Sequence, residues 1–448
     1  MTDSLTLRAG MVGMGMIFDE TYRPFFEKAH HDGIYDRRFG DVSVPLVAVA
    51  SKTGKRADAY RQAAGEKLHP FQSFAGEDAV DQLLKSGVNF ACVATPDDRH
   101  FEASKKILNA GCHLLVEKPS VLSLQELDEL VALAKQKQLL AKVVYHKLLD
   151  PDHKKLRTLV HDNVLQHVNT GYCSLLEPKS ISGGQFAEWI VGRNPGTYVA
   201  VHYIKLIDFT FGGQLKAITA TGQRGLVGPK DGPTWDSTQM RMVYEYTDGR
   251  NAAFDIHTSW VTPDNFPGYV EQEVQFRFDN GVWNGHSRKR GVECTVEGLT
   301  PIKLKTTMNN HYNGSFVEPW GERSQRGYGI EVLERFVREL AYVEFADGGS
   351  RKSEVGSKTA KQNLPSSACG LPTSASRDER YRAVQSLAYN DLAADRQTVA
   401  AVQALEAILA RHAAGEPDCV VRVNDAKGGL VLYRPGKEQA EVLYGGNV

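Results

Sequence analysis

Short apolar runs alternate with amphipathic segments through the first 145 residues. Continuous apolar runs are typical of buried parallel strands, and a 3.6-residue periodicity is typical of helices. The expected strands cover residues 6–12, 44–50, 88–94, 113–117 and 140–145, and the expected helices cover 78–84, 101–109 and a segment that begins after Ser123. This order predicts a doubly wound α/β domain over residues 1–145.

The pattern changes after residue 145. Alternating apolar and polar residues predict strands over 168–176, 215–221, 240–246, 252–260 and 270–278. Helical periodicity covers 152–162, 328–344 and 388–413, the last as one long helix or two. Residues 347–380 are rich in Gly, Ser, Lys and Pro, which predicts an exposed insertion. Residues 146–448 are therefore expected to form an α+β domain with a mainly antiparallel sheet.

Length and charge limit the possible functions. At 448 residues the chain is long enough for two domains. Its 53 Lys and Arg residues balance 54 Asp and Glu residues, which argues against nucleic acid or a membrane surface as the main partner. The N-terminus lacks the features of a signal peptide, and six cysteines occur without Cys-x-x-Cys pairs. These features predict a reduced, cytoplasmic protein without a metal site.

A glycine pair follows the first expected strand, in the strand–turn–helix context of a dinucleotide fingerprint. The turn comprises Gly13, Met14, Gly15, Met16 and Ile17. Gly13 would permit the tight turn, and Gly15 would let the backbone approach a pyrophosphate at the helix N-terminus. Phe18 replaces the third glycine of the fingerprint, and Pro24 is expected to break or restart the following helix. A plain turn without a ligand is the alternative.

The second expected strand ends in a basic segment that contains Ser51, Lys52 and Arg56. An Asp or Glu at this point would bind the ribose 2′-hydroxyl of NAD, but the segment has neither. A hydroxyl followed by cations suits a 2′-phosphate better, which favours NADP over NAD. A solvated basic turn is the alternative.

A carboxylate, an ammonium and a proline end the strand expected over 113–117. Ligands of doubly wound sheets bind at the carboxyl ends of the strands, where Glu117 and Lys118 are expected. Pro119 cannot donate to a sheet, so it favours placing Lys118 at the crevice. A strand-end salt bridge is the alternative. The neighbouring expected strand ends in a segment that includes Ala94, Thr95, Pro96 and His100.

Together with His202 in a glycine-flanked helix, these motifs resemble in order and spacing the glucose–fructose oxidoreductase, inositol dehydrogenase and MocA (Gfo/Idh/MocA) family. The resemblance covers nearly the whole chain. It implies a Rossmann dinucleotide-binding domain joined to a substrate-binding and oligomerisation domain with an open-faced sheet. It also implies hydride transfer between NAD or NADP and a hydroxyl or carbonyl carbon of a sugar, sugar derivative or cyclitol, in a homodimer or homotetramer.

The resemblance assigns roles to the motif residues. The expected cofactor-binding residues are Gly13, Met14, Gly15, Met16, Ile17, Ser51, Lys52, Arg56, Ala94, Thr95, Pro96, His100, Glu117, Lys118 and Pro119. Lys118 and His202 would face the reacting carbon. The expected substrate-binding residues are His146, Trp189, Arg193 and Lys205, with packing or surface roles as the alternative.

The chain departs from the family at the second motif. The family commonly has Asp-x-Gly-x-His-x-x-Asp, and the matching positions hold Tyr198, Ala200, His202 and Lys205. Tyr198 could replace the missing Asp as proton donor or acceptor. The expected catalytic residues are therefore Lys118, His202 and Tyr198, with His202, expected to titrate near neutrality, as the main acid/base. Lys118 would orient and polarise the substrate oxygen.

Two other functions fit the same residues. The first is a glycosidase-type enzyme that retains NAD and has no net redox change. The second is a non-catalytic nucleotide-binding regulatory protein, for which the lost Asp and the replaced third glycine are the motivating features. Accumulation of free NAD(P)H during turnover would distinguish a dehydrogenase from both.

Overall fold

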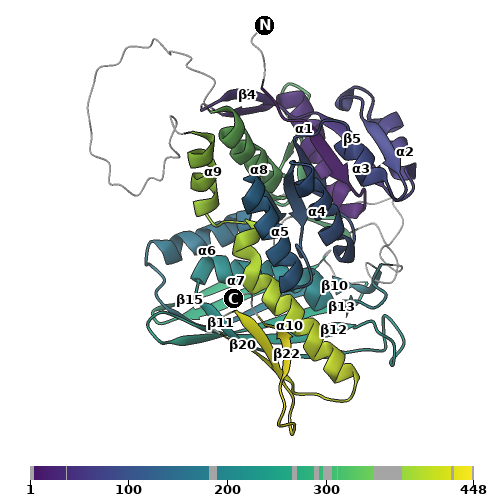
Figure 1. The fold of residues 1–448 in the computed structure, drawn as a ribbon. Helices are drawn as coiled ribbons and strands as arrows, with labels where there is room; N and C mark the ends of the chain where they lie inside the picture. Colours follow the sequence, from purple (N-terminus) through teal and green to yellow (C-terminus); the bar gives the residue numbers. More distant parts are fainter. Residues whose placement is uncertain are drawn as a thin grey trace, which may run out of the picture.

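The structure is a computed structural model that describes residues 5–36, 38–180, 189–264, 270–286, 292–295, 305–309, 311–346, 376–424 and 428–445. A parallel sheet with its helices forms the upper part of Figure 1, and a larger sheet forms the lower part. Two helices lie between them.

The upper sheet has six parallel strands in the order β6–β5–β2–β7–β8–β9. The strands are β2 (Ala9–Val12), β5 (Leu46–Ser51), β6 (Gln72–Ala75), β7 (Phe90–Val93), β8 (His113–Glu117) and β9 (Ala141–Val144). All residues of β2, β7, β8 and β9 are buried, as expected for strands covered on both faces. The strand order reverses between β2 and β7, which confirms the predicted Rossmann fold and locates its crevice there.

Helices connect these strands. They are the π-helical turn η1 (Phe18–Tyr22), α1 (Arg23–Asp32), α2 (Lys55–Ala64), α3 (Ala79–Leu84), α4 (His100–Asn109) and α5 (Leu124–Lys137). Pro24 occupies the first turn of α1, where proline is tolerated, so the helix restarts as predicted. The Ser123 hydroxyl oxygen accepts a hydrogen bond from the Glu126 N–H (3.3 Å) and caps α5.

Four elements of this part were missed by the sequence prediction. Helix α2 was missed, because its polar residues resemble those of a turn; it begins directly after Gly54, which has a φ of +74°. The long connection between α1 and β5 contains β3 (Ile34–Asp36) and β4 (Gly40–Ser43), which pair with β1 (Leu5–Thr6) in a small separate sheet. Strand β6 was also missed, because its residues have no apolar alternation.

The lower sheet has nine strands in the order β15–β14–β10–β13–β12–β11–β20–β21–β22. The strands are β10 (Val168–Pro178), β11 (Gln214–Gln223), β12 (Ser237–Glu245), β13 (Asn251–Thr262), β14 (Glu271–Phe278), β15 (Gly281–His286), β20 (Val420–Asn424), β21 (Gly429–Tyr433) and β22 (Glu441–Tyr444). The sheet is mainly antiparallel, as predicted. Strands β10 and β13 run parallel, because a helical crossover from β10 to β11 keeps the chain direction before two hairpins lead to β13.

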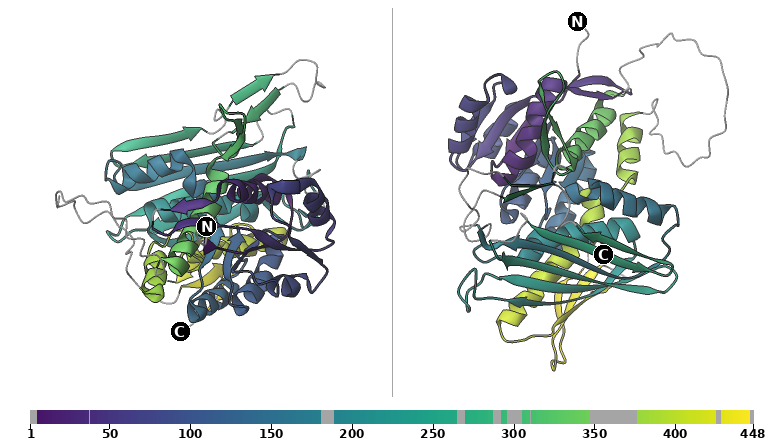
Figure 2. Two further views of the ribbon diagram at one scale, coloured as in Figure 1. Left: turned by 90° about the horizontal axis from the view of Figure 1, so that it is seen from above. Right: turned by 180° about the vertical axis from the view of Figure 1, so that it is seen from behind.

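One face of this sheet is covered by helices. Helices α7 (Val201–Phe211) and α10 (Arg396–Ala413) lie between it and the Rossmann part, and α6 (Pro151–His161) packs beside α7 (Figures 1 and 2). Along β13 the residues that face these helices are buried and the alternate residues are half-buried. Within the part of the chain that the structure describes, the opposite face carries no helix (Figure 2).

The C-terminal part of the chain returns to the Rossmann sheet. Helix α8 (Tyr328–Phe345) packs against it, with the rings of Phe336 and Phe90 5.5 Å apart. It follows the small hairpins β16 (Val292–Thr295)–β17 (Lys305–Met308) and β18 (Gly314–Val317)–β19 (Arg323–Arg326). A boundary between domains at residue 145 stays a prediction.

Two expectations about the last hundred residues need correction. Most of the predicted insertion at 347–380 lies outside the described residues, but its end forms α9 (Arg377–Ser386), in which Arg380 is fully buried. The helix expected over 388–413 begins only at Arg396, after a 3₁₀ turn, because Ala388 has a φ of +45°.

Candidate active site

The glycine turn after β2 has the geometry of a dinucleotide cradle. Gly13 has a φ of +92°, and a Cβ there would lie 2.3 Å from the Ala94 carbonyl oxygen, so only glycine fits. A Cβ on Gly15 would meet nothing within 4 Å, which leaves open space for a ligand against the backbone. The Thr95 hydroxyl is buried without a hydrogen-bond partner among the described residues, beside this turn. These features fit a bound nicotinamide dinucleotide.

The remaining turn residues support this cradle. Met14 is buried, whereas Met16 and Ile17 are half-buried at the start of η1. The Ala94 side chain is also buried, and Pro96 is half-buried directly before a 3₁₀ turn.

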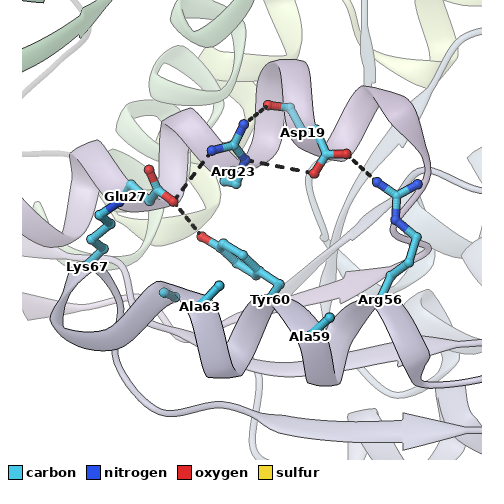
Figure 3. A pocket seen from close by; sticks show the side chains of 9 residues that line it. Asp19, Arg23, Glu27, Arg56, Ala59, Tyr60, Ala63 and Lys67 are labelled. Atoms are coloured by element: carbon cyan, nitrogen blue, oxygen red, sulfur yellow. Dashed lines mark hydrogen bonds and ion pairs between the residues drawn. The ribbon is translucent and has the colours of Figure 1, made fainter.

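The basic segment after β5 is only partly available to a ligand. Lys52 is exposed, and the Ser51 hydroxyl oxygen accepts a hydrogen bond from the Gly54 N–H (3.1 Å). Arg56 forms an ion pair with Asp19 across the pocket between α1 and α2 (Figure 3). Arg23 also reaches Asp19 in this pocket. Arg56 would therefore have to exchange this carboxylate for a phosphate.

The His100 side chain connects the ends of two strands. Its ring nitrogens lie 2.9 Å from the Thr95 carbonyl oxygen and 2.8 Å from that of Pro119, whose peptide bond with Lys118 is cis. Burial lowers the pKa of His100. Both ring nitrogens contact carbonyl oxygens, so His100 links the loops that follow β7 and β8, and its role in cofactor binding stays a prediction.

Glu117 is buried at the end of β8. It accepts hydrogen bonds from the Tyr22 hydroxyl (3.1 Å) and the Lys118 N–H (3.3 Å). Burial raises the pKa of Glu117 to about 7, against the opposing effect of Lys118. The carboxylate therefore anchors the strand end directly before the lysine.

Lys118 leaves β8 and crosses to the segment before α7. Its amine donates a hydrogen bond to the Tyr198 carbonyl oxygen (2.9 Å) and lies 4.0 Å from the centre of the Tyr198 ring. Burial lowers the pKa of Lys118, while the carboxylates of Glu117 and Glu177 act in the opposite direction. Lys118 therefore has a perturbed pKa, and it connects the end of β8 to the segment before α7.

His202 and His146 form a buried pair beside this lysine. Their ring centres are 4.5 Å apart, and Nδ1 of each ring lacks a hydrogen-bond partner among the described residues. Burial, with the nearby cations, lowers the pKa of both rings well below the ordinary value. The expectation that His202 titrates near neutrality is therefore wrong for the protein without ligands, because burial of the ring disfavours its charged form.

Aromatic side chains cluster around Tyr198 and His146. The Trp189 ring lies 4.6 Å from that of Tyr198 and 6.4 Å from that of Trp260, measured between centres. On the other side, Tyr312 lies 5.1 Å from His146. Trp260 and Tyr312 were not among the predicted site residues, because nothing in their local sequence distinguishes them from core aromatics.

Glu177 is the polar residue that the sequence prediction missed. It lies at the end of β10, is buried, and accepts a hydrogen bond from Trp260 Nε1 (2.9 Å). The alternation of Cys173, Leu175 and Glu177 on the inward face of β10 is a signal that could have identified it.

Two predicted substrate-binding residues are engaged elsewhere. Arg193 pairs with Asp97 and, at 3.0 Å, with Asp98, so it links the segment before α7 to the loop after β7. Lys205 donates to the Ala394 carbonyl oxygen and lies 3.5 Å from Asp208. Its amine is therefore engaged with the 3₁₀ turn that precedes α10, and a substrate-binding role for Lys205 stays a prediction.

Three further findings concern the described residues. Among the described residues, no group of three or more His, Cys, Asp or Glu side chains could hold a metal ion. No helix in the described ranges is long and apolar enough to cross a membrane. Cys92, Cys112, Cys173 and Cys419 are free and buried.

The chain is similar to known oxidoreductases. The profile of the oxidoreductase family with an NAD-binding Rossmann fold (GFO_IDH_MocA) matches residues 7–145. The chain is 33% identical over 79 residues to UDP-N-acetylglucosamine 3-dehydrogenase of Acidithiobacillus ferrooxidans, covering 18% of this chain and 25% of the relative. It is 27% identical over 229 residues to a glycosyl hydrolase family 109 protein of Saccharopolyspora erythraea. This alignment covers 45% of this chain and 49% of that protein. The alignments thus span about half or less of these relatives.

A solved structure extends the likeness of the fold to nearly the whole chain. The crystal structure of GenD2 from gentamicin A biosynthesis, in complex with NAD, has a TM-score of 0.61 and 18% identity, covering 94% of this chain and 97% of that one. The matched profile, the six-stranded Rossmann sheet and the Glu117-Lys118-Pro119 strand end thus identify residues 7–145 as an NAD-binding domain of the Gfo/Idh/MocA type, and the remainder of the chain shares the fold of GenD2.

Proposed function

We propose that this protein is an NAD(P)-dependent oxidoreductase that acts on a CH–OH group, or on the corresponding carbonyl, of a sugar, sugar derivative or cyclitol. The observation that carries the proposal is the Lys118 amine, held 2.9 Å from the Tyr198 carbonyl oxygen at the crevice of a dinucleotide-binding sheet. An acid/base group at this point can exchange a proton with a substrate oxygen.

Lys118 is the better candidate for the main acid/base. Oxidation of an alcohol needs a group that removes the hydroxyl proton, and burial increases the neutral fraction of Lys118 by lowering its pKa. In the reverse direction the protonated amine would donate to the carbonyl oxygen. The nicotinamide, when bound, would accept or supply the hydride.

His202 and Tyr198 support Lys118 in this scheme. A pKa well below the ordinary value leaves the His202 ring neutral, so it would orient a substrate hydroxyl by hydrogen bonding without carrying charge. Tyr198 lies under the Lys118 amine and would position it. This reverses the roles that the sequence suggested for Lys118 and His202.

The proposed substrate class fits the crevice and the relatives. Trp189, Tyr198 and Trp260 offer aromatic faces that suit the C–H face of a sugar ring or cyclitol. One relative is named as a dehydrogenase of UDP-N-acetylglucosamine. The His146–His202 pair would bind hydroxyls of the same substrate.

We also propose a preference for NADP over NAD. The segment after β5 carries no acid that could bind the ribose 2′-hydroxyl, and Lys52 is exposed there. The ion pair of Arg56 with Asp19 is itself exposed, so a 2′-phosphate could displace it at small cost. A homodimer or homotetramer stays a prediction from the family.

Calorimetric titration with NAD⁺, NADP⁺, NADH and NADPH is the first test, followed by a screen of sugars and cyclitols at 340 nm. We expect binding of the 2′-phosphorylated pair to be tighter, and formation of NADPH with at least one substrate. Lys118→Met should fold as the wild type does and lose about 10²-fold or more of the rate. Failure of the folded protein to bind any of the four nucleotides would refute the proposal.

A second candidate is a glycosidase that retains its nucleotide. It is motivated by the similarity to the family 109 protein, which extends over 229 residues. In this case, purified protein would contain NAD, would cleave a glycoside, and would release no free NADH. The absorbance at 340 nm during turnover distinguishes the two functions.

A further inference from the structure

We propose that Asn194 and Glu406 are positioning residues, which hold Lys118 in place through the backbone segment that carries its hydrogen-bond acceptor. The two side chains come from distant parts of the chain, because Asn194 precedes α7 and Glu406 lies in α10. The inference rests on the proposed function of Lys118 as acid/base. It extends the machinery of the site to a helix that contributes no group to the crevice in that proposal.

The acceptor of Lys118 is a backbone group, so its position depends on the chain that carries it. The Lys118 amine donates to the Tyr198 carbonyl oxygen (2.9 Å), which belongs to the π-helical turn η6 (Gly196–Ala200). Turns of this kind are rare and occur frequently at functional sites. Contacts that fix the backbone directly before Tyr198 therefore also fix the point at which the amine is held.

Asn194 provides such contacts with both ends of its amide. Its Oδ1 accepts a hydrogen bond from the Thr197 N–H (2.8 Å), in the manner of a helix N-cap. Its Nδ2 donates to the Thr197 hydroxyl oxygen (3.1 Å) and to Glu406 Oε1 (2.7 Å). The Thr197 hydroxyl donates to the same carboxylate oxygen. Asn194 and Thr197 are buried, so these bonds tie the residue before Tyr198 to α10.

The backbone of η6 also packs directly on its surroundings. A Cβ on Gly196 would lie 2.5 Å from Leu405 Cδ2 and 2.6 Å from Thr238 Oγ1. Leu405 and Glu406 are neighbours in α10, so this helix holds the turn both by packing and by hydrogen bonds to a charged group. The turn therefore follows the position of α10 closely.

The Rossmann part holds the same segment from the other direction. Arg193 pairs with Asp97 and, at 3.0 Å, with Asp98 in the loop after β7. Because Arg193 and Asn194 are adjacent in the chain, the segment is anchored to the Rossmann loop by one residue and to α10 by the next. The Tyr198 carbonyl is thus placed relative to both parts of the molecule.

A purely structural anchor is the alternative to a positioning role. Glu406 is exposed, so truncation of its side chain opens no cavity in the core and should leave the protein folded. Glu406→Ala keeps the bonds between Asn194 and Thr197 and removes the connection to α10. An effect on Lys118 can therefore be separated from an effect on the fold.

The first test measures Lys118 directly and needs no substrate. Acetic anhydride modifies neutral amines that it can reach, and mass spectrometry of the Lys118 peptide gives the labelling rate at one fixed pH. The hydrogen bond to the carbonyl holds the amine and favours its charged form. Glu406→Ala should therefore speed labelling by roughly threefold to tenfold, as expected for the loss of one hydrogen bond. Glu406→Gln keeps an acceptor oxygen and should restore the wild-type rate.

The matched control is Arg411→Ala. Arg411 lies on the same helix but pairs with Glu441 of β22, so its truncation weakens the contacts of α10 away from η6. The labelling rate of Lys118 should stay at the wild-type value. Urea unfolding of each variant establishes that it is folded. If Glu406→Ala does not fold, Thr197→Val, which removes the other donor to this carboxylate, takes its place.

The second test uses an active substrate and a double variant. Displacement of the lysine should lower kcat of Glu406→Ala about tenfold, because proton transfer depends on the placement of the amine. In a Lys118→Met background the same substitution should cost nothing further, since the group that Glu406 positions is absent. A structural anchor would lower the rate equally in both backgrounds.

Three results decide between the alternatives. Wild-type labelling in folded Glu406→Ala, or equally fast labelling in Arg411→Ala, would overturn the inference. A rate loss of the same size with and without Lys118 would overturn it as well. Faster labelling of Glu406→Ala in a protein that oxidises no sugar or cyclitol would support the positioning of Lys118 and refute the proposed function instead.

Discussion

At the scale of single residues, burial away from water sets the direction of the pKa shifts around Lys118. The same desolvation raises the pKa of Glu117 and Glu177 to about 7 and lowers that of Lys118 and His202. Groups that would all be charged or half-charged in water are thereby moved toward their neutral forms. A site of this kind is suited to moving protons near neutral pH.

The buried histidines make folding stability depend on pH. His146 and His202 stay neutral in the folded protein, whereas in the unfolded chain they bind protons below about pH 6.5. The unfolded state therefore binds more protons as the pH falls, and each ring should lower the free energy of unfolding by up to about 1.4 kcal/mol per pH unit between pH 6.5 and 5.

Urea unfolding of the wild type and His202→Gln at pH 7, 6 and 5 tests this prediction. The loss of stability with falling pH should be smaller in the variant, because one titrating ring is absent. His161→Gln is the control, because His161 is exposed at the end of α6. Equal pH dependence in wild type and His202→Gln would show that the ring is protonated in the folded state.

At the scale of elements, the turn between β2 and η1 has two glycines with different requirements. Gly13 is needed by the fold, since its φ of +92° and the Ala94 carbonyl leave no room for a side chain. Gly15 has open space around it, so its small size is not required by the protein's own packing. A ligand is the physical reason that remains for Gly15.

The pair Gly13→Ala and Gly15→Ala separates these requirements. Gly13→Ala should reduce the free energy of unfolding by about 1–3 kcal/mol through backbone strain. Gly15→Ala should change it by less than about 0.5 kcal/mol, while nucleotide binding weakens by roughly tenfold or more because the Cβ occupies the approach to the pyrophosphate. Denaturation and calorimetry measure both effects. Wild-type nucleotide affinity in Gly15→Ala would place the pyrophosphate elsewhere.

At the scale of the whole molecule, buried ion pairs connect parts of the chain that are far apart in sequence. Lys142, in β9, is fully buried and lies 2.7 Å from Glu339 of α8 and 3.3 Å from Asp391, before α10. Nearby, Asp395 accepts hydrogen bonds from Ser120 (2.6 Å) and Tyr145 (2.9 Å). These buried ion pairs and hydrogen bonds thus connect the Rossmann sheet to the C-terminal helices.

Lys142→Met should destabilise the protein by about 3–5 kcal/mol, because it leaves two buried carboxylates without their cation. Urea unfolding measures the loss. Lys135→Met, at an exposed position of α5, is the control and should change stability by less than about 0.5 kcal/mol. A Lys142→Met variant as stable as this control would mean that the carboxylates take up protons on folding instead.

The local pattern was sufficient for much of the fold and part of the site. The apolar runs ending at residues 50, 94 and 117 correspond to β5, β7 and β8, because continuous burial on both faces leaves a clear mark on a strand. The glycine turn and Lys118 were also found from the sequence, because their roles depend on residues that are adjacent in the chain. Helix α2 was missed because its polar residues resemble those of a turn.

The sequence by itself determined the parallel sheet, the mainly antiparallel sheet and the position of Lys118 at a strand end, because strand periodicity and turn residues are local properties. Only the tertiary structure decided which polar groups surround that lysine. It brought Glu177 and Trp260 to the crevice, occupied Arg193 and Lys205 elsewhere, and set the direction of each pKa shift. Those outcomes depend on which distant segments meet and exclude water, and one-dimensional patterns do not encode that directly.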